Sequence, residues 1–349
     1  MQKPEVIPPL VIRADAGAQI GLGHVTRCLA LAEWWRGRGG EVVLARAFCP
    51  AALEERWRGL QIELTRIKSS PGSLEDAAEL VETAREHASA RVVIDGYVFG
   101  GEYQRALKKA GLRVLALDDY GHAGHYWADW VLNQNLGASA ELYSSRESHT
   151  QLLLGSRFVQ LRQEFLPWQK WRRKTPGVAR KVLVTLGGSD PANFTRTVIV
   201  ALTKLEEDLE AVALVGAGNA HRESLERMAS KTKGRVRIEF NPGEVARWMA
   251  WADVAVAGAG TTAWELAFMG LPSVMVCLAE NQRGAARLLD EGGLVELAGW
   301  HSEVSATQLG TRLRQLLTNP RRRREMSRRG RELVDGAGGS RVGSALLSG

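Results

Sequence analysis

The sequence predicts an α/β protein of two domains, each built on a mostly parallel sheet with helices on both faces. The chain has 349 residues, which is above the size at which a single core keeps growing, so two domains are expected. Short apolar runs alternate with helix-like segments along most of the chain, as in parallel β-α-β units. One segment, 165–180, interrupts this alternation with two Pro, two Trp and a cluster of basic residues, which is typical of a linker.

The first round of alternation supplies the elements of an N-terminal domain. Apolar runs that end in polar residues predict strands. These are 10–15, 41–48, 91–95 and 113–118, with two short ones around 130–132 and 152–154. Helical spacing or helix-start signals predict helices at 24–36, 73–87 and 103–110, and Ser73 with its acidic first turn is a clear start signal.

The second round repeats the pattern after the linker. Its predicted strands are 181–186, 211–215, 235–240, 253–257 and 272–278, with helices between them such as 192–204. We therefore expect an N-terminal Rossmann-like domain over 1–165, a linker over 166–180 and a C-terminal Rossmann-like domain over 181–349. Open sheets of this kind bind ligands at the carboxyl ends of their strands, so the two domains should face each other across a ligand cleft.

Composition and charge restrict the function classes. No apolar run reaches the ~20 residues of a membrane helix, and the first residues lack the pattern of a signal peptide. The three cysteines are too few and too far apart for a disulfide framework or a metal clip. The net charge of +7 suits an anionic ligand, while the basic run 321–324 is expected to be a solvated helix face. We expect a cytoplasmic monomer without nucleic-acid or membrane partners.

The first motif with chemical content is RADAGAQIGLGHVTRC, residues 13–28. Its glycines allow close backbone approach, and the free N–H groups of a helix start suit an anion. His24 stands on the first turn of the predicted helix, where it would place a base at the mouth of the cleft. A helix cap or a packing role is the structural alternative for His24. We assign catalysis to His24 and substrate binding to Arg13, Asp15, Gly21 and Gly23.

The second motif lies in the second domain and reads GAGTTAWE from Gly258. A predicted strand enters the Gly-rich turn and a helix starts after it, which suits a pyrophosphate. Glu265 lies one turn into that helix, where its carboxylate can accept from both hydroxyls of a ribose. A surface helix acid is the alternative for Glu265. The predicted nucleotide-binding set is Gly258, Ala259, Gly260, Thr261, Thr262 and Glu265.

Three further places supply candidates for substrate contacts, each after a predicted strand. Asn281 and Gln282 carry amides that suit hydroxyl or acetamido groups, although a helix cap is the alternative for Asn281. Gly188 and Ser189 lie in a turn that points to the same cleft, where tight-turn chemistry is the alternative. Tyr97 follows the strand 91–95 and so lies near the cleft.

Other chemistries find little support in the sequence. His122 and His125 form an H-x-x-H pair beside Asp118 and Asp119, but their spacing matches no zinc pattern, so no metal is expected. The G-x-S-x-G elbow of Ser hydrolases and the GxxxxGK[ST] loop of ATPases are missing from the sequence. No cofactor is predicted.

Taken together, the motifs resemble one family over nearly the whole chain. They are RADAGAQIGLGHVTRC, VIDGY, LDDYG, NQN, LLLGSRF, LVTLGGSDPANFT, GAGTTAWELAFMGLP, AENQ and VDGAGGSRV. They are similar to motifs of the UDP-2,4-diacetamido-2,4,6-trideoxy-β-L-altropyranose hydrolases of pseudaminic acid biosynthesis. That family is similar in fold to GT-B glycosyltransferases, which have two facing Rossmann domains. The GAGTT…E segment is shared with those transferases, whereas the segment around His24 is much more specific to the hydrolases.

The resemblance implies inverting hydrolysis of a UDP-sugar at the anomeric carbon, without a metal. By motif match, His24 would be the base that activates water and Tyr97 would line the sugar site. The other implied roles are pyrophosphate binding by 258–262, ribose binding by Glu265, and sugar binding by Asn281 and Gln282. The segment AENQ stands where ADNQ is common in the family, so Glu280 replaces a shorter acid, which bears on the stereochemistry of the sugar.

Two other functions compete with the hydrolase. A glycosyltransferase of the same fold would use an acceptor hydroxyl in place of water, and a membrane acceptor would favour an exposed apolar patch rimmed with basic residues on the N-terminal domain. A non-catalytic UDP-sugar binding module is the third reading, and His24 argues against it. Release of UDP without any acceptor distinguishes the hydrolase from both.

Overall fold

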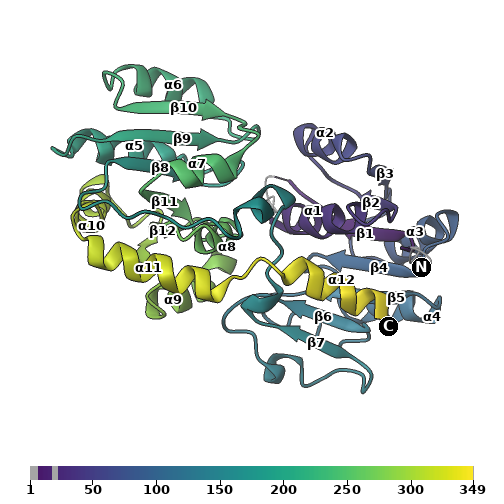
Figure 1. The fold of residues 1–349 in the computed structure, drawn as a ribbon. Coiled ribbons are helices and arrows are strands. Elements are labelled where there is room, and N and C mark those ends of the chain that lie inside the picture. Colours follow the sequence, from purple (N-terminus) through teal and green to yellow (C-terminus); the bar gives the residue numbers. More distant parts are fainter. Residues whose placement is uncertain (1–6, 18–22, 349) are drawn as a thin grey trace, which may run out of the picture. The chain divides into compact units, whose positions relative to one another are not determined.

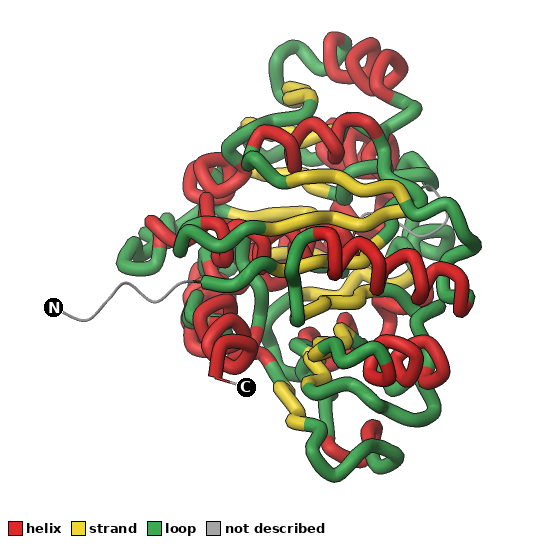
Figure 2. The backbone as a smooth tube through the Cα atoms, turned by 90° about the vertical axis from the view of Figure 1, so that its right-hand side faces the viewer, coloured by secondary structure: helices red, strands yellow, loops and turns green. Residues whose placement is uncertain are grey.

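The computed structural model describes residues 7–17 and 23–348 and divides the chain into two compact units. Unit 1 comprises residues 1–163 and 337–349, and unit 2 comprises residues 164–336. Each unit is built on one sheet in which the paired strands are parallel (Figure 1). Figure 2 shows strands lying side by side with helices packed around them.

Unit 1 contains a seven-stranded sheet in the order β3-β2-β1-β4-β5-β6-β7. Its strands are β1 (Leu10–Ala14), β2 (Val42–Arg46), β3 (Glu63–Arg66), β4 (Arg91–Asp95), β5 (Arg113–Leu117), β6 (Trp130–Asn133) and β7 (Gln151–Leu154). Its α-helices are α1 (Gly23–Arg36), α2 (Ala51–Gly59), α3 (Leu74–Glu86), α4 (Gly101–Lys109) and α12 (Gly338–Ser348). Because β1 pairs with β4, Ala14 lies beside Asp95, and the carboxyl ends of these strands are neighbours.

Helices cover both faces of the unit 1 sheet because successive strand residues point to opposite sides. Leu10 packs in a buried cluster with α1 and α12 that includes Leu29 and Val342. Val11 packs in a second cluster with α3 and α4 that includes Leu80. This is the arrangement expected of a parallel sheet, whose strands are apolar on both faces.

Unit 2 contains a six-stranded sheet in the order β10-β9-β8-β11-β12-β13. Its strands are β8 (Lys181–Thr185), β9 (Glu210–Val215), β10 (Val236–Phe240), β11 (Val254–Gly258), β12 (Ser273–Cys277) and β13 (Glu296–Trp300). Its α-helices are α5 (Phe194–Lys204), α6 (Arg222–Ser230), α7 (Val245–Trp251), α8 (Thr262–Phe268), α9 (Arg283–Glu291), α10 (Ala306–Thr318) and α11 (Pro320–Leu333). The predicted fold class, two Rossmann-like α/β domains, is confirmed.

Two edge strands, β3 and β13, were not predicted from the sequence. Every residue of β3 is at least partly exposed, and so is every residue of β13. Edge strands of this kind lack the apolar run by which a buried strand is recognised. Among the helices of the described residues, none is both long and apolar enough to cross a bilayer.

The C-terminal helix belongs to unit 1, which differs from the predicted domain over 181–349. Val342 and Leu346 of α12 are fully buried in the core on the α1 face. The helix can approach closely because it carries glycines: Gly338 lies against Val159, and Gly343 lies against the ring of Trp34. The apolar spacing of α12 indicates that one face of the helix is buried, but it does not indicate which of the two sheets that face packs on.

The predicted linker, 166–180, packs on unit 2 rather than standing apart from it. The Arg173 guanidinium donates to the carbonyl oxygens of Met249 at 2.6 Å and Gly270 at 3.0 Å, near the ends of α7 and α8. Burial lowers the pKa of Arg173 to about 9. Arg323 of α11 donates to the carbonyl oxygen of Gly177 at 3.1 Å, so two arginines hold this segment in place.

We expect Gly343→Ala to lower the free energy of unfolding by about 1–3 kcal/mol, because the added methyl group would overlap the Trp34 ring. Urea denaturation measures this change. Gly339→Ala is the matched control on the same helix, since a Cβ there would lie 3.4 Å from the nearest atom of Trp34. Equal stability of the two variants would contradict the close packing of α12 on α1.

Candidate active site

His24 lies at the start of α1, beside the carboxyl end of β4. Its side chain is 7% exposed, and its Nδ1 lies 2.6 Å from Oδ1 of Asp95, the last residue of β4. Because a carboxylate only accepts, this distance assigns the proton to Nδ1 and leaves the lone pair on Nε2. An imidazole oriented in this way can take a proton from water through Nε2.

Arg27, one turn after His24, holds the same carboxylate. Its Nε donates to Oδ2 of Asp95 and its Nη2 to Oδ1, both at 2.6 Å, while its Nη1 donates to Oδ1 of Asp119 at 2.8 Å. Nη2 also lies 3.4 Å from Nδ1 of His24, but both atoms carry hydrogen when Nδ1 donates to Asp95, so this contact is not a hydrogen bond. Arg27 was not among the predicted site residues, although its three-residue spacing from His24 on a predicted helix indicates a shared face.

Opposite charges stabilise one another in this buried cluster. Burial would raise the pKa of Asp95, but Arg27 and His24 outweigh burial and hold that pKa well below its usual range. Burial opposes ionisation of Asp119 in the same way, and Arg27 again lowers the pKa. Asp119 and Asp95 together raise the pKa of Arg27 despite its burial. Both carboxylates and the guanidinium are therefore charged at neutral pH.

Tyr97, which was predicted to line the sugar site, contacts His24 directly. The two ring centroids lie 4.9 Å apart in an edge-to-face arrangement. The Tyr97 hydroxyl donates to Oδ2 of Asp119 at 2.7 Å, and Asn135 donates to Oδ1 of Asp119 at 2.8 Å. Tyr120, which is 52% exposed, packs against Tyr97 at 5.0 Å. Aromatic side chains beside a base are typical of the walls of a small-molecule site.

The two histidines of the H-x-x-H pair contact different partners. His122 Nδ1 lies 2.5 Å from Oδ2 of Asp118, whereas His125 lies 3.0 Å from the Ser145 hydroxyl and 3.1 Å from Glu147. Within residues 7–17 and 23–348, no three His, Cys, Asp or Glu side chains are grouped so as to hold a metal ion.

Asp118 organises the loop that follows β5 and carries Tyr120. Its Oδ1 accepts from the backbone N–H groups of Tyr120 at 2.7 Å and Gly121 at 2.6 Å, and its Oδ2 accepts from the Tyr126 hydroxyl at 2.6 Å. Burial would raise the pKa of Asp118, but His122, Tyr126 and Gly121 outweigh burial and hold it well below its usual range.

We expect Asp118→Asn to lower the free energy of unfolding at neutral pH by about 3 kcal/mol, because several donors lose a charged acceptor. The folded-state pKa of Asp118 is lowered, so its contribution is present above the unfolded pKa of about 3.9 and is lost as pH falls through the folded pKa. The wild type should therefore lose stability below about pH 4, and the variant should lose less. Urea denaturation over this pH range checks the difference, and parallel curves would contradict it.

Arg13 and Asp15, which were predicted to contact the substrate, are both held by partners within unit 1. The Arg13 side chain is fully buried, donates to Asp76 of α3 through Nε and Nη2 at 2.9 Å each, and lies 2.7 Å from Asp15. Asp15 in turn accepts from the backbone N–H groups of Ala47 and Phe48, which follow β2. A buried guanidinium needs such partners. The sequence did not reveal them, because Asp76 lies 63 positions away in the chain.

The glycines of the first motif remain predictions as substrate contacts. Gly23 is the first residue of α1 and is exposed beside His24. Gly21 lies outside the described residues.

In unit 2, the GAGTT segment joins β11 to α8. Gly258 ends β11, and the backbone N–H of Ala259 continues the sheet by donating to Val276. As far as the described residues show, the side chain of Thr261 makes no cap hydrogen bond at the start of α8. The positive end of the helix dipole lies there. Glu265, one turn into α8, is 7% exposed.

The amide of Gln282 lies against this same turn. Gln282 belongs to η4 (Glu280–Gln282), and its Oε1 accepts from the backbone N–H of Leu278 at 2.8 Å. Its Nε2 would lie 3.4 Å from a Cβ built on Gly260. The structure thus brings the predicted sugar-binding segment of Asn281 and Gln282 next to the predicted pyrophosphate-binding turn. Glu280, the residue that departs from the family pattern, pairs with Arg283 at 2.9 Å.

The TLGGSD turn after β8 has a defined packing partner. Gly188 lies against Gly216: a Cβ built on Gly216 would come within 2.5 Å of the Gly188 backbone. The Asp190 carboxylate accepts from the backbone N–H groups of Phe194 and Thr195 at 2.9 Å each, so a side chain already occupies the N-terminus of α5. Contacts of Gly188 and of the partly exposed Ser189 with the substrate remain predictions.

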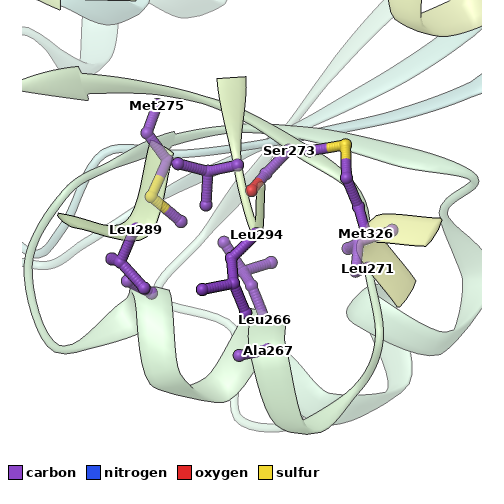
Figure 3. A pocket seen from close by; sticks show the side chains of 10 residues that line it. Leu266, Ala267, Leu271, Ser273, Met275, Leu289, Leu294 and Met326 are labelled. Atoms are coloured by element: carbon purple, nitrogen blue, oxygen red, sulfur yellow. The ribbon is translucent and has the colours of Figure 1, made fainter. Parts of the chain in front are cut away.

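A small pocket lies on another side of α8, between α8, α9, α11 and β12. Figure 3 shows Leu266, Met275, Leu289 and Met326 gathered around it, with Ser273 at its wall. Its apolar lining offers few partners for a phosphate or a sugar, so we treat it as a packing feature of unit 2.

Comparisons with known proteins agree with this division of the chain. Residues 182–337 match the family described as Glycosyltransferase family 28 C-terminal domain. The chain has the fold of the MurG crystal structure from Acinetobacter baumannii, with a TM-score of 0.67, 18% sequence identity, and coverage of 98% of this chain and 100% of that one. The predicted GT-B class is thereby confirmed.

Three relatives share similarity over most of this chain. The UDP-2,4-diacetamido-2,4,6-trideoxy-beta-L-altropyranose hydrolase of Campylobacter jejuni is 23% identical over 81% of this chain and 97% of its own length. The spore coat polysaccharide biosynthesis protein SpsG of Bacillus subtilis is 25% identical over 96% of each chain. An uncharacterised protein of Methanocaldococcus jannaschii is 23% identical over 78% of this chain, which spans only 56% of that relative's length. The resemblance stated from the motifs is confirmed: the chain is a relative of this hydrolase and of GT-B UDP-sugar enzymes.

Proposed function

We propose that this relative of the hydrolase and of GT-B enzymes hydrolyses a UDP-linked 2,4-diacetamido-2,4,6-trideoxy sugar to free sugar and UDP. The observation that carries the proposal is the pair of His24 and Asp95, joined at 2.6 Å in unit 1. A binding module does not need an oriented base, whereas a hydrolase does. The His24 segment is also the part of the sequence that most specifically resembles the hydrolases.

The proposed reaction is a single displacement by water. Nε2 of His24 takes one proton from the water as its oxygen bonds to the anomeric carbon. The bond between that carbon and the β-phosphate oxygen breaks, and its electrons leave with UDP. Attack from the face opposite UDP inverts the anomeric configuration. Asp95 accepts from Nδ1 throughout and stabilises the imidazolium that forms.

Unit 2 is proposed to hold the nucleotide. The turn 258–262 and the start of α8 suit the pyrophosphate, since N–H groups and a helix dipole stabilise negative charge. The charge that develops on departing UDP is stabilised by the same groups, so they contribute to catalysis as well as to binding. Glu265 is assigned to the ribose, and Asn281 with Gln282 to the sugar. No step is assigned to a metal.

A glycosyltransferase is the second candidate, supported by the family 28 domain over 182–337. In that case an acceptor hydroxyl would take the place of water at His24. The chemistry of the base would be unchanged, so the geometry of unit 1 does not separate the two reactions.

Release of UDP from a panel of UDP-diacetamido-trideoxy sugars and UDP-N-acetylglucosamine, with and without EDTA, tests the proposal. We expect rapid release from the altro-configured sugar without any acceptor and without sensitivity to EDTA. UDP binding with no release from any of these sugars would favour the transferase.

A further inference from the structure

We propose that Arg27, itself held by Asp119, is a positioning residue for the His24 base. This inference rests on the function proposed above. Arg27 lies one turn after His24 on the same helix, α1, and its side chain is 7% exposed. It is the shared partner of two carboxylates at the carboxyl ends of neighbouring strands: Asp95 ends β4, and Asp119 follows β5.

The fork of Arg27 fixes the plane of the Asp95 carboxylate. Oδ1 of Asp95 accepts hydrogen bonds from Nδ1 of His24 and Nη2 of Arg27. Oδ2 accepts a hydrogen bond from Nε of Arg27 and a weak one from the Cys28 thiol at 3.5 Å. Among the described residues, only His24 and the Cys28 thiol would oppose a rotation about Cβ–Cγ of Asp95 if Arg27 were removed. A bidentate guanidinium prevents that rotation, whereas a lysine ammonium is a single point charge.

The charges of the cluster match the proton transfer. Asp95, Asp119 and Arg27 carry a formal net charge of −1 when all are ionised, as the directions of their pKa shifts require. A proton on His24 makes the cluster neutral. Asp119 supplies the excess negative charge, because Arg27 and Asp95 alone would cancel each other. The buried cluster is thus complementary to the imidazolium that forms when water is activated.

Asp119 also couples this clamp to the aromatic wall. Its Oδ1 accepts from Arg27 and Asn135, and its Oδ2 accepts from the hydroxyl of Tyr97, whose ring lies against His24. Arg27 therefore fixes the direction of the His24 imidazole through Asp95, and Asp119 fixes the position of the Tyr97 ring beside it. An error of about 1 Å in such a geometry can lower turnover about 10²-fold.

The test uses Arg27→Lys, the double variant R27M/D119N and the control Arg46→Lys. Arg46 ends β2 and pairs with Glu54 at 2.7 Å rather than with a carboxylate of the cluster. The double variant removes one positive and one negative charge together, so it avoids leaving Asp119 buried without a partner. Folding is checked by circular dichroism, and kcat and KM are measured by UDP release from the altro-configured UDP-sugar.

We expect Arg27→Lys and R27M/D119N to lower kcat about 10²-fold with KM changed less than about threefold, and Arg46→Lys to match the wild type. The ¹⁵N shifts of the His24 imidazole, assigned against His24→Gln, should show the single Nδ1–H tautomer in the wild type and its loss in both Arg27 variants. In a further variant, Arg27→Ala, added methylguanidinium should restore part of the lost turnover. The tautomer is measured without any substrate, so it tests the positioning role of Arg27 even if the protein releases no UDP. Wild-type kcat, or a wild-type tautomer in the double variant, would overturn the proposal.

Discussion

Replacing His24 by glutamine should lower the rate of UDP release by about 10²–10⁴-fold, the usual contribution of a general base. Glutamine fills much of the imidazole volume, and its amide N–H can still donate to Asp95. In the wild type, Asp95 accepts from Nδ1 of His24 at 2.6 Å. It has no basic nitrogen, so water would have to attack without losing a proton to the protein. Stopped or continuous assays of UDP release, at saturating UDP-sugar, measure the loss in kcat.

Binding of UDP alone should be unchanged in this variant, because the nucleotide is assigned to unit 2. Isothermal titration with UDP checks this point. His125→Gln is a suitable control: His125 contacts Ser145 and Glu147 and takes no part in the cluster around Asp95, so its turnover should match the wild type. If His24→Gln kept wild-type turnover, another group would have to be the base.

The fold was predictable from the sequence because parallel strands buried on both faces leave apolar runs that are easy to recognise. The edge strands β3 and β13 were not, since partial exposure removes that signal. The placement of α12 also escaped prediction, because its buried residues Val342 and Leu346 fit any apolar surface of the right shape. Shape complementarity with Trp34 is a property of the folded chain.

The candidate site was predictable only in part, because some of its features leave a local signal in the sequence and others do not. A histidine after a Gly-rich turn can be recognised locally, as His24 was. The partners of a buried charge cannot, because Asp95 and Asp119 lie 68 and 92 positions from Arg27 and meet it only through strand order. A similar distance in sequence, 63 positions, concealed the pairing of Arg13 with Asp76.

Replacing Glu265 by alanine should weaken UDP binding by about 10–100-fold, since hydrogen bonds to a charged group contribute about 1.5–3 kcal/mol. Glu265 is 7% exposed on α8, close to the turn that is assigned to the pyrophosphate. The rate at saturating substrate should fall much less than in His24→Gln, because the ribose is bound alike in the ground state and the transition state. Isothermal titration with UDP measures the loss of affinity.

The ligand provides the sharper control. If the Glu265 carboxylate accepts from the ribose hydroxyls, the wild type should bind 2′-deoxy-UDP more weakly than UDP, and Glu265→Ala should bind both almost equally. This cycle isolates the contact between the carboxylate and the hydroxyl from any general disturbance of α8. Glu291→Ala, on the exposed face of α9, should leave both affinities as they are. Undiminished discrimination in Glu265→Ala would show that the ribose is recognised by another residue, and that burial of Glu265 serves the packing of α8 instead.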